Sequence, residues 1–385
     1  MQVVGGMAVV AHEGVLGALE AHKALGRNED VLLLADELDV AHELALKRRA
    51  HAMGRLMLGP GAGHARMGGL ALGLANHLED GPVGIVAASG GAARALGVQL
   101  ARLGVGVRAC LVAGRRDLTE DIGGLGAVAA LERLRHDPQV RALVVVPWPA
   151  PDAEAADRVV SLAAGHDHPV VVCALGREVV APPGVTVTDT VDDAAAAVAR
   201  ALGRGVSAPS APRPRWVSGG LIRGLFGSGG LCAEAVWALR QRLERVATNV
   251  PGTDAEPLGG PGADRVHTCI DLGAPELRGA RPHPVHDGTI RAAALAQLNG
   301  DHRVRVVLLD VTLGYGADPD PAGALAAPVR ELLRLRPQVS VLAHIVGTER
   351  DPQGLAEQER RLADLGVRVM ASSASAARLA AALVS

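Results

Sequence analysis

Aromatic residues are nearly absent from this 385-residue chain, which has three tryptophans, one tyrosine and one phenylalanine. So few rings offer no platform on which nucleic-acid bases could stack. Lysine and arginine number 39 against 41 aspartates and glutamates, so the chain also lacks the positive field that attracts a phosphate backbone. Both deficits exclude a nucleic-acid-binding protein, and the cores must be built from alanine, valine and leucine.

Disulfide patterns, membrane spans and export signals are missing as well. The four cysteines are widely spaced and form no Cys-x-x-Cys pair, and Cys110 and Cys173 lie in apolar runs, which indicates buried free thiols. No apolar run reaches the length of a membrane span, and the N-terminus lacks the pattern of a signal peptide. We therefore expect a soluble cytoplasmic protein that has no membrane partner.

Short apolar runs alternate with helical patterns through most of the chain. The clearest runs occupy residues 84–89, 109–114, 142–147, 169–176, 304–311 and 339–348. Because their apolarity is continuous rather than alternating, it indicates strands covered on both faces, and hence parallel sheets in an α/β fold. The run VRALVVVP at 140–147 matches VRVVLLDV at 304–311, which predicts two tandem flavodoxin-like domains.

The leading residues 1–80 resemble a shortened nucleotide-binding unit. A buried strand is expected at 31–35 and another at 55–61, but no G-x-G-x-x-G fingerprint follows the first strand. Residues 204–215 contain three prolines and no periodicity, which predicts a linker. The predicted domains are a truncated Rossmann-like segment (1–80), a first flavodoxin-like domain (81–203), the linker and a second flavodoxin-like domain (216–385).

A Ser-Gly-Gly turn occurs twice, each time after an apolar run and before an alanine-rich helical pattern. The two copies are Ser89-Gly90-Gly91 and Ser228-Gly229-Gly230. A turn that opens a helix leaves backbone N–H groups pointing outward, and the helix dipole adds positive charge there, so each turn predicts a phosphate or carboxylate site. The alternative is an N-cap serine followed by glycines that a tight turn needs.

The best catalytic candidates lie in the second half. Arg281 and His283 begin a proline-rich loop at 281–287, where arginine can bind a carboxylate or phosphate and histidine can move a proton. Asp310 ends an apolar strand at the edge where open α/β sheets bind ligands. A metal at His283, His286 and Asp287 would have no standard ligand spacing, so no metal is predicted.

Four further charged residues lie near these candidates or in the matching loop of the first half. Arg291 follows on the next helix as another anion-binding group. Glu234 lies in the helix after the second turn, where it either orients a partner group or is a solvated carboxylate. Arg116 and Asp117 occupy a strand-end loop of the first half, and we expect an internal ion pair there rather than a site.

Several segments carry a family resemblance. The segments are 73–91, 115–124, 169–176, 223–235, 271–273, 279–291, 306–326 and 347–353. The run from Ser228 to Ala235 resembles the start of the power helix in succinyl-CoA synthetase α subunits, whose pattern is S-G-T-L-T-Y-E-A. Over about residues 44–385 the chain resembles the FdrA family, a branch of the acyl-CoA-synthetase-like superfamily.

This resemblance implies a subunit of an enzyme complex that handles carbamoyl phosphate or an acyl phosphate, of the oxamate carbamoyltransferase type found in purine or allantoin breakdown. That activity cleaves oxalurate with phosphate to oxamate and carbamoyl phosphate, and it requires partner subunits. The glycine turns would hold phosphate or carbamoyl phosphate, and Arg281 would neutralise charge. His283 would handle the proton, and Asp310 would orient the amide.

The chain also departs from the family pattern. Arg94-Ala95 replaces a Gln-Glu pair after the first turn, and Gly61-Ala62-Gly63-His64-Ala65 replaces a D-C-G-T-A turn. No G-H-A-G-A phosphohistidine segment occurs, which counts against the alternative of a succinyl-CoA synthetase α-like acyl-CoA ligase subunit with CoA as a ligand. A non-catalytic scaffold or regulatory subunit is a third hypothesis. We expect an oligomer whose working site surrounds the second turn, with the first turn as a weaker anion site.

Overall fold

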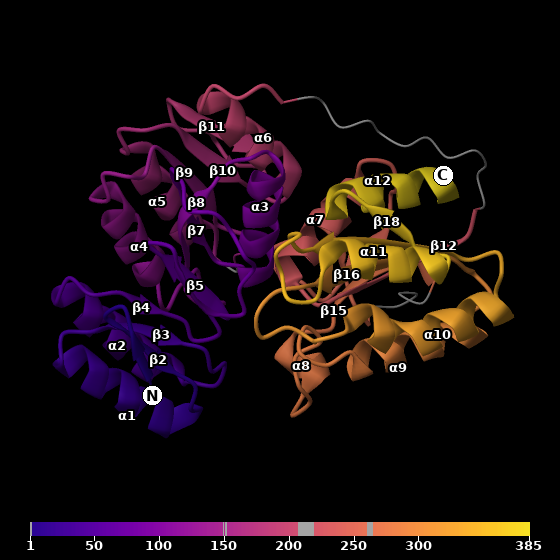
Figure 1. Cartoon of the computed structure of the whole chain (residues 1–385), viewed down its shortest axis with the longest axis horizontal. Helices are drawn as coiled ribbons and strands as arrows, with labels where there is room; N and C mark the ends of the chain where they lie inside the picture. The colour runs from indigo at the N-terminus through magenta and orange to yellow at the C-terminus, as the bar shows by residue number, and fades with distance from the viewer. Residues whose placement is uncertain (1, 149, 151, 207–218, 260–264) are drawn as a thin grey trace. The chain divides into compact units, whose positions relative to one another are not determined.

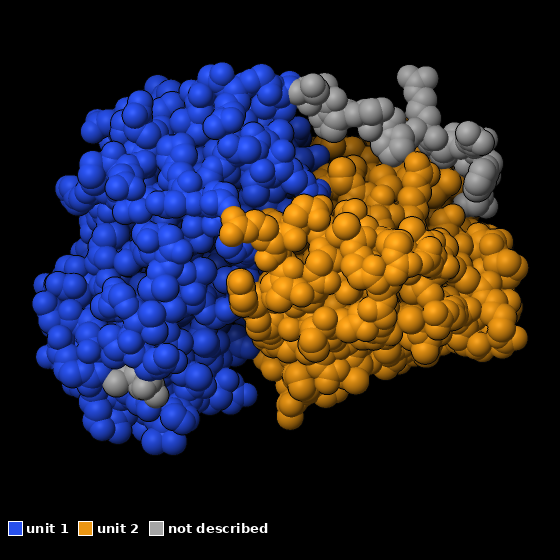
Figure 2. All heavy atoms as spheres, in the orientation of Figure 1, with its two compact units in different colours: residues 1–206 blue, residues 207–385 orange. Residues whose placement is uncertain are grey.

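The computed structural model describes residues 2–148, 150, 152–206, 219–259 and 265–385. The chain divides into two compact units, residues 1–206 and 207–385, which are coloured blue and orange in Figure 2. Most of the predicted linker, residues 207–215, lies outside the described residues. None of the helices in the described part of the chain combines the length and apolarity that crossing a bilayer requires.

A four-stranded sheet begins the first unit, with strand order β1-β2-β3-β4. Its elements are β1 (Gln2–Val4), β2 (Met7–Val10), α1 (Gly14–Gly26), β3 (Asp30–Leu33), α2 (Val40–Ala52) and β4 (Met57–Leu58). The last three strands run parallel, whereas β1 pairs antiparallel with β2. Alanine, valine and leucine form its core, including Ala21, Leu25 and Leu33, as the scarcity of aromatic residues requires.

A seven-stranded sheet completes the first unit, in the order β11-β10-β9-β7-β8-β5-β6. Its strands are β5 (His64–Met67), β6 (Leu70–Gly73), β7 (Val83–Ala87), β8 (Val107–Val112), β9 (Ala142–Val146), β10 (Val170–Cys173) and β11 (Val185–Thr188). Its helices are α3 (Gly90–Arg102), α4 (Leu125–Arg135), α5 (Ala153–Ala164) and α6 (Val191–Ala201). The hairpin of β5 and β6 falls inside the predicted range 1–80, yet β5 pairs antiparallel with β8 of this sheet.

The second unit contains another seven-stranded sheet, in the order β14-β13-β15-β12-β16-β17-β18, and its described strands pair in parallel. Its strands are β12 (Leu221–Phe226), β13 (Val246–Thr248), β14 (Glu256–Pro257), β15 (His267–Asp271), β16 (Val304–Thr312), β17 (Ser340–Val346) and β18 (Arg368–Met370). Its helices are α7 (Gly229–Arg240), α8 (Pro275–Arg278), α9 (Thr289–Gln297), the short 3-10 helix η2 (Leu298–Gly300), α10 (Pro321–Leu335), α11 (Leu355–Asp364) and α12 (Ser373–Val384). In Figure 1, α7 and α12 pack together on one side, and α9 and α10 pack together on the other.

The predicted α/β fold with parallel sheets is confirmed. The apolar run at 142–147 is the fully buried strand β9, and the run at 304–311 is β16, whose residues are buried except for Arg305. Each Ser-Gly-Gly turn follows a central strand, β7 in one sheet and β12 in the other, where the strand order changes direction. In open α/β sheets this is the position at which ligands bind.

A buried network of charges joins the two sheets of the first unit. Nζ of Lys47 on α2 donates to Oε1 of Glu43 (2.9 Å) and to Oδ1 of Asp117 (2.6 Å), and all three side chains are almost fully buried. Asp117 also accepts from the backbone N–H groups of Gly126 and Ala127 at the start of α4, and Arg116 pairs with Glu43. Arg116 and Asp117 therefore each form an ion pair with the leading segment rather than with each other.

We expect Lys47→Met to destabilise the first unit by roughly 3–5 kcal/mol, because Asp117 and Glu43 would stay buried after losing the cation they share. Hydrogen exchange, followed by mass spectrometry of peptides from β3 and β8, measures the loss within this unit. The matched control is Arg27→Met, which removes an exposed arginine paired with Glu29 in the same unit and should change protection little. Equal protection in both variants would show that the buried network contributes nothing.

Candidate functional site

Both Ser-Gly-Gly turns start their helices in the same way. The hydroxyl of Ser89 accepts from Ala92 N (3.4 Å), and the hydroxyl of Ser228 accepts from Leu231 N (3.4 Å), so each serine is an N-cap. The cap satisfies the third N–H of each helix. The two glycine N–H groups before it have no intrahelical acceptor, which leaves the end of each helix suited to an anion.

The first turn is surrounded by nitrogen atoms of side chains. A Cβ atom placed on Gly90 would lie 3.6 Å from Nη1 of Arg94 and 3.7 Å from Nδ1 of His64, with the carbonyl oxygen of Ala62 at 3.2 Å. Arg94 and His64 are both buried, at 7% and 4% exposure. The arginine adds a positive charge to the helix N-terminus, so this turn has the electrostatic character of an anion site.

His64 is held in its neutral form. Burial, together with the charge of Arg94, lowers the pKa of His64 from 6.5 to about 3. Its Nε2 lies 3.3 Å from Sγ of Cys110, whose pKa is raised to about 12 by burial, so that contact joins two neutral groups. Nδ1 of His64 is buried and has no hydrogen-bond partner within the described residues. The residue pattern predicted no role for His64, and its only signal was its place in the Gly61–Ala65 turn that departs from the family.

The second turn is fixed by Asp310 at the end of β16. Oδ1 of Asp310 accepts from Gly227 N (2.7 Å) and from Nη2 of Arg291 on α9 (2.9 Å). The side chains of Asp310 and Arg291 are 1% and 6% exposed, so the pair is a buried salt bridge. The structure thus brings these two predicted residues together beside the turn, where each neutralises the other.

Asp271 approaches the same turn, and His283 lies close to Asp271. A Cβ atom on Gly229 would lie 2.9 Å from Oδ2 of Asp271, which ends β15, and one on Gly273 would collide with Nε2 of His283. Nδ1 of His283 accepts from Val285 N at 3.3 Å, which places the proton of the neutral ring on Nε2. Asp271 is absent from the predicted site residues, although the D-L-G segment at 271–273 was noted. A histidine and a carboxylate beside a helix N-terminus can exchange a proton with a ligand.

Two predicted residues have other surroundings than expected. The guanidinium of Arg281 is exposed and donates to the carbonyl oxygens of Arg278 (3.0 Å) and Leu277 (2.6 Å), so it caps the end of α8. Glu234 is fully buried, which rules out the alternative of a solvated helical carboxylate.

Nδ1 of His286 contacts the carbonyl oxygen of Gly316 (2.6 Å). Within the described ranges, no group of three or more histidine, cysteine, aspartate or glutamate residues is placed to hold a metal ion.

The neutral state of His64 predicts a pH dependence of stability. Its pKa is lower in the folded than in the unfolded chain, so the unfolded state binds more protons between about pH 3 and pH 6.5, and stability falls as the pH falls through this window. Between about pH 7.5 and pH 5 the loss from this residue is roughly 2 kcal/mol.

Hydrogen exchange of β5 and β8, corrected for the intrinsic pH dependence of exchange, measures this loss. His64→Gln cannot titrate, so it should lose less protection than the wild type over the same interval. A matched control is His51→Gln, which replaces an exposed histidine of the same unit. If the wild type and His64→Gln lose protection equally, His64 does not titrate with a lowered pKa.

The Asp310–Arg291 pair predicts a strong effect in the second unit. We expect Asp310→Asn to destabilise this unit by roughly 3–5 kcal/mol, because a buried guanidinium loses its counter-charge. Adding Arg291→Met should recover part of this loss, since the variant then buries no uncompensated charge. Exchange of β12 and β16 peptides is the measurement, with the exposed Glu331→Gln as the control. Simple additivity of the two substitutions would contradict the pairing.

Comparison with known proteins shows the family to which the chain belongs. Residues 225–383 match the model of the CoA-ligase family. The Escherichia coli K12 protein named "Uncharacterized protein YahF" is 32% identical over 396 residues, which cover 97% of this chain and 76% of that protein. The succinate–CoA ligase [ADP-forming] subunit alpha of Methanothermobacter thermautotrophicus is 29% identical over 157 residues, which cover 40% of this chain and 51% of that subunit.

Solved structures are similar at a lower level. The dinucleotide-forming acetyl-coenzyme A synthetase 1 of Ca. Korarchaeum cryptofilum, in complex with phosphate and ADP, aligns over 98% of this chain and 82% of its own length, with 15% identity and a TM-score of 0.39. The ATP citrate lyase of Methanothrix soehngenii, in complex with citrate and coenzyme A, aligns over 53% and 41%, with 14% identity and the same TM-score. The 32% identity to YahF extends over 97% of this chain. This chain therefore belongs to the family of Escherichia coli YahF, and it has a CoA-ligase domain in its second unit.

Proposed function

We propose that this chain is a subunit of an acid–CoA ligase-type enzyme, in which the N-terminus of α3 holds a phosphate or an acyl phosphate. The observation that carries the proposal is the approach of Arg94 and His64 to Gly90 at the helix N-terminus. The match of residues 225–383 to the CoA-ligase family supports the same class of reaction. The relative from Methanothermobacter is named a subunit, which supports an assembly with partner chains.

At the first turn each side chain has a distinct role in this proposal. Ser89 caps the helix, and the N–H groups of Gly90 and Gly91 donate to the anion. Arg94 neutralises the charge on the ligand through its guanidinium. His64, which stays neutral at physiological pH, donates or accepts a single hydrogen bond without adding charge.

At the second turn the proposal assigns proton transfer to His283, with Asp271 as its neighbour. Asp310 and Arg291 act as positioning residues, because their buried salt bridge fixes Gly227 and the start of α7. Ser228, Gly229 and Gly230 form a second, weaker anion site, since Asp271 opposes a negatively charged ligand there. Nε and Nη2 of Arg281 donate to carbonyl groups at the end of α8, so the proposal gives the charge neutralisation to Arg94 instead.

Coenzyme A would be the acyl acceptor of such a reaction. Its adenosine phosphates would need donors beyond the residues described above, and no glycine fingerprint follows β2 or β3 to supply them. We therefore propose no CoA-binding residue in this chain. The acyl group would pass from the phosphate held at α3 to a thiol supplied with CoA: the C–S bond would form as the C–O bond to phosphate breaks, and inorganic phosphate would leave with the thiol proton.

A second candidate is the oxamate carbamoyltransferase activity of FdrA-like proteins. The segments 223–235, 279–291 and 306–326, which carry the FdrA resemblance, favour this candidate. Both reactions require an anion site for phosphate and a group that transfers a proton. They differ in the acceptor, which is a CoA thiol in one and inorganic phosphate in the other.

The test is activity of the assembled complex, copurified with its partner chains. One assay supplies a carboxylic acid, CoA and ATP and measures acyl-CoA, and the other supplies oxalurate and phosphate and measures carbamoyl phosphate. The first assay should give product and the second should not. Product only in the second assay would make the chain a carbamoyltransferase subunit, and equal activity of the partners without this chain would make it a scaffold.

The substitution Arg94→Gln tests the anion site proposed at the N-terminus of α3. Because Arg94 supplies a charge-assisted hydrogen bond, we expect phosphate to bind about tenfold more weakly in this variant. The control is Arg102→Gln, which replaces an exposed arginine at the far end of the same helix and should bind phosphate as the wild type does. Calorimetric titration with inorganic phosphate gives both affinities, and unchanged binding by Arg94→Gln would remove the proposed role of α3.

A further inference from the structure

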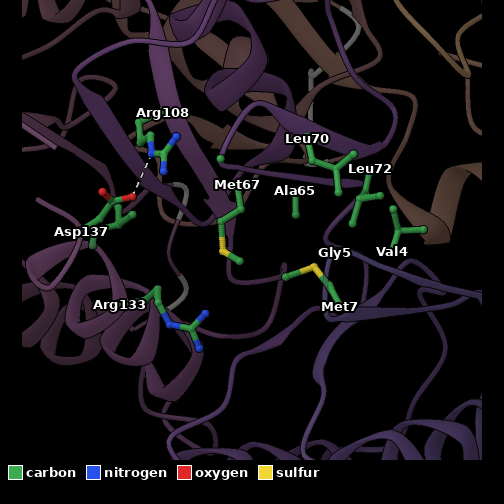
Figure 3. Close-up of a pocket in the computed structure, with 12 residues that line it drawn as sticks. Val4, Gly5, Met7, Ala65, Met67, Leu70, Leu72, Arg108, Arg133 and Asp137 are labelled. Atoms are coloured by element: carbon green, nitrogen blue, oxygen red, sulfur yellow. Dashed lines mark hydrogen bonds and ion pairs between the residues drawn. The ribbon is translucent and has the colours of Figure 1, made fainter. Parts of the chain in front are cut away.

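A cavity of about 460 Å³ lies in the first unit. It is lined by the end of β1 and the start of β2, the β5–β6 hairpin, the start of β8 and the end of α4 (Figure 3). The lining residues at β8 and α4 are at the amino end of the parallel strands. The first Ser-Gly-Gly turn lies at the opposite, carboxyl end of the same sheet, so the cavity is separate from the proposed anion site. Its volume falls within the range of about 300–1,000 Å³ that holds small organic ligands.

Two glycine pairs form the turns beside this cavity. Gly5 and Gly6 connect β1 to β2, Gly68 and Gly69 connect β5 to β6, and all four have positive φ angles. A Cβ atom on Gly5 would lie 2.9 Å from Cδ2 of Leu70, so any larger residue would push into the rim. Leu70 itself is 40% exposed, which leaves a large apolar side chain facing solvent beside the cavity.

The lining is divided into an apolar part and a charged part. Figure 3 shows Arg108, Arg133 and Asp137 on one side, and the aliphatic and methionine side chains on the other. The apolar part consists of Val4, Met7, Ala65, Met67, Leu70 and Leu72, and Leu134, which follows Arg133 on α4, also lines the cavity. Unbranched thioether side chains adapt to a flexible aliphatic chain, so this side suits an alkyl group rather than a rigid ring of fixed shape.

The charged part selects the head group. Arg108 donates through Nε to Asp137 (3.0 Å) and through Nη1 to Asp80 (3.1 Å), and among the described residues Nη2 has no acceptor. Arg133 uses both terminal nitrogens on Asp30 (2.8 and 3.1 Å). A ligand therefore meets the remaining Nη2 donor of Arg108, with Asp137 in the same lining. Because two arginines face three carboxylates here, a dianion would be repelled strongly, and a single carboxylate that accepts from Nη2 is the most negative head group that fits.

We propose that this cavity binds an aliphatic monocarboxylate of medium chain length. The carboxylate accepts from Nη2 of Arg108, and the alkyl chain packs between Met7, Met67 and Leu72. Such a ligand touches both the leading sheet and the seven-stranded sheet of the first unit. Binding therefore stabilises this unit as a whole, independently of the phosphate site proposed at α3.

Calorimetry of the full chain with sodium octanoate tests the proposal, with acetate, 1-octanol, octylammonium and inorganic phosphate as comparison ligands. We expect one octanoate per chain. Acetate lacks the alkyl chain, octanol lacks the charge and octylammonium reverses it, so each should bind at least about tenfold more weakly. Phosphate should not displace octanoate. Octanol or octylammonium that binds as tightly as octanoate would overturn the assignment of a carboxylate.

Two variants locate the binding. Arg108→Met removes the donor and should weaken octanoate about tenfold, while Arg141→Met, an exposed arginine of the same unit, should not. Met67→Trp fills the cavity and leaves every charge in place, so it decides the question if Arg108→Met does not fold. Its control is Leu162→Trp on exposed α5 surface. Octanoate that binds Met67→Trp with wild-type affinity would place the ligand elsewhere and overturn the proposal.

Discussion

One carboxylate oxygen holds the second site together. Oδ1 of Asp310 accepts from the backbone of Gly227 and from the side chain of Arg291, so the end of β16, the turn before α7 and helix α9 meet at a single atom. Movement of any of them would leave an N–H group or a charge without its partner in a buried place, which costs several kcal/mol. The direction in which Gly229 and Gly230 present their N–H groups follows from this contact.

The glycines around that oxygen are required by space. A Cβ atom on Gly227 would lie 2.8 Å from Nη2 of Arg291, and one on Gly229 would lie 2.9 Å from Oδ2 of Asp271. A Cβ atom on Gly273 would collide with His283. None of the three has a positive φ angle, so their backbone angles alone would allow any residue type. The nearby atoms are what require glycine. These three glycines are therefore required by the close approach of charged side chains to the backbone.

The sequence predicted the strands and turns better than the contacts between side chains within the site. Continuous runs such as 142–147 identify buried parallel strands, because a run covered on both faces needs no polar positions. The turns at Ser89 and Ser228 were also predictable, since an N-cap serine acts on residues three positions away. Asp271 and His64 were missed because their approach to Gly229 and Gly90 arises from sheet pairing between distant segments. The local contacts of Arg281 were equally hidden from the pattern: its Nε and Nη2 donate to carbonyl groups three and four residues away, and its role at a site stays a prediction.

The two turns share a backbone but differ in charge. At the first, Arg94 adds a positive charge beside a histidine that burial keeps neutral. At the second, Asp310 cancels the charge of Arg291, and Asp271 adds a negative charge beside His283. A helix N-terminus contributes the same partial positive charge in both places, so the side chains decide what each turn prefers. The two turns thus present their N–H groups in the same way within different electrostatic surroundings, which is why we propose a phosphate at the first turn and a group that exchanges a proton at the second.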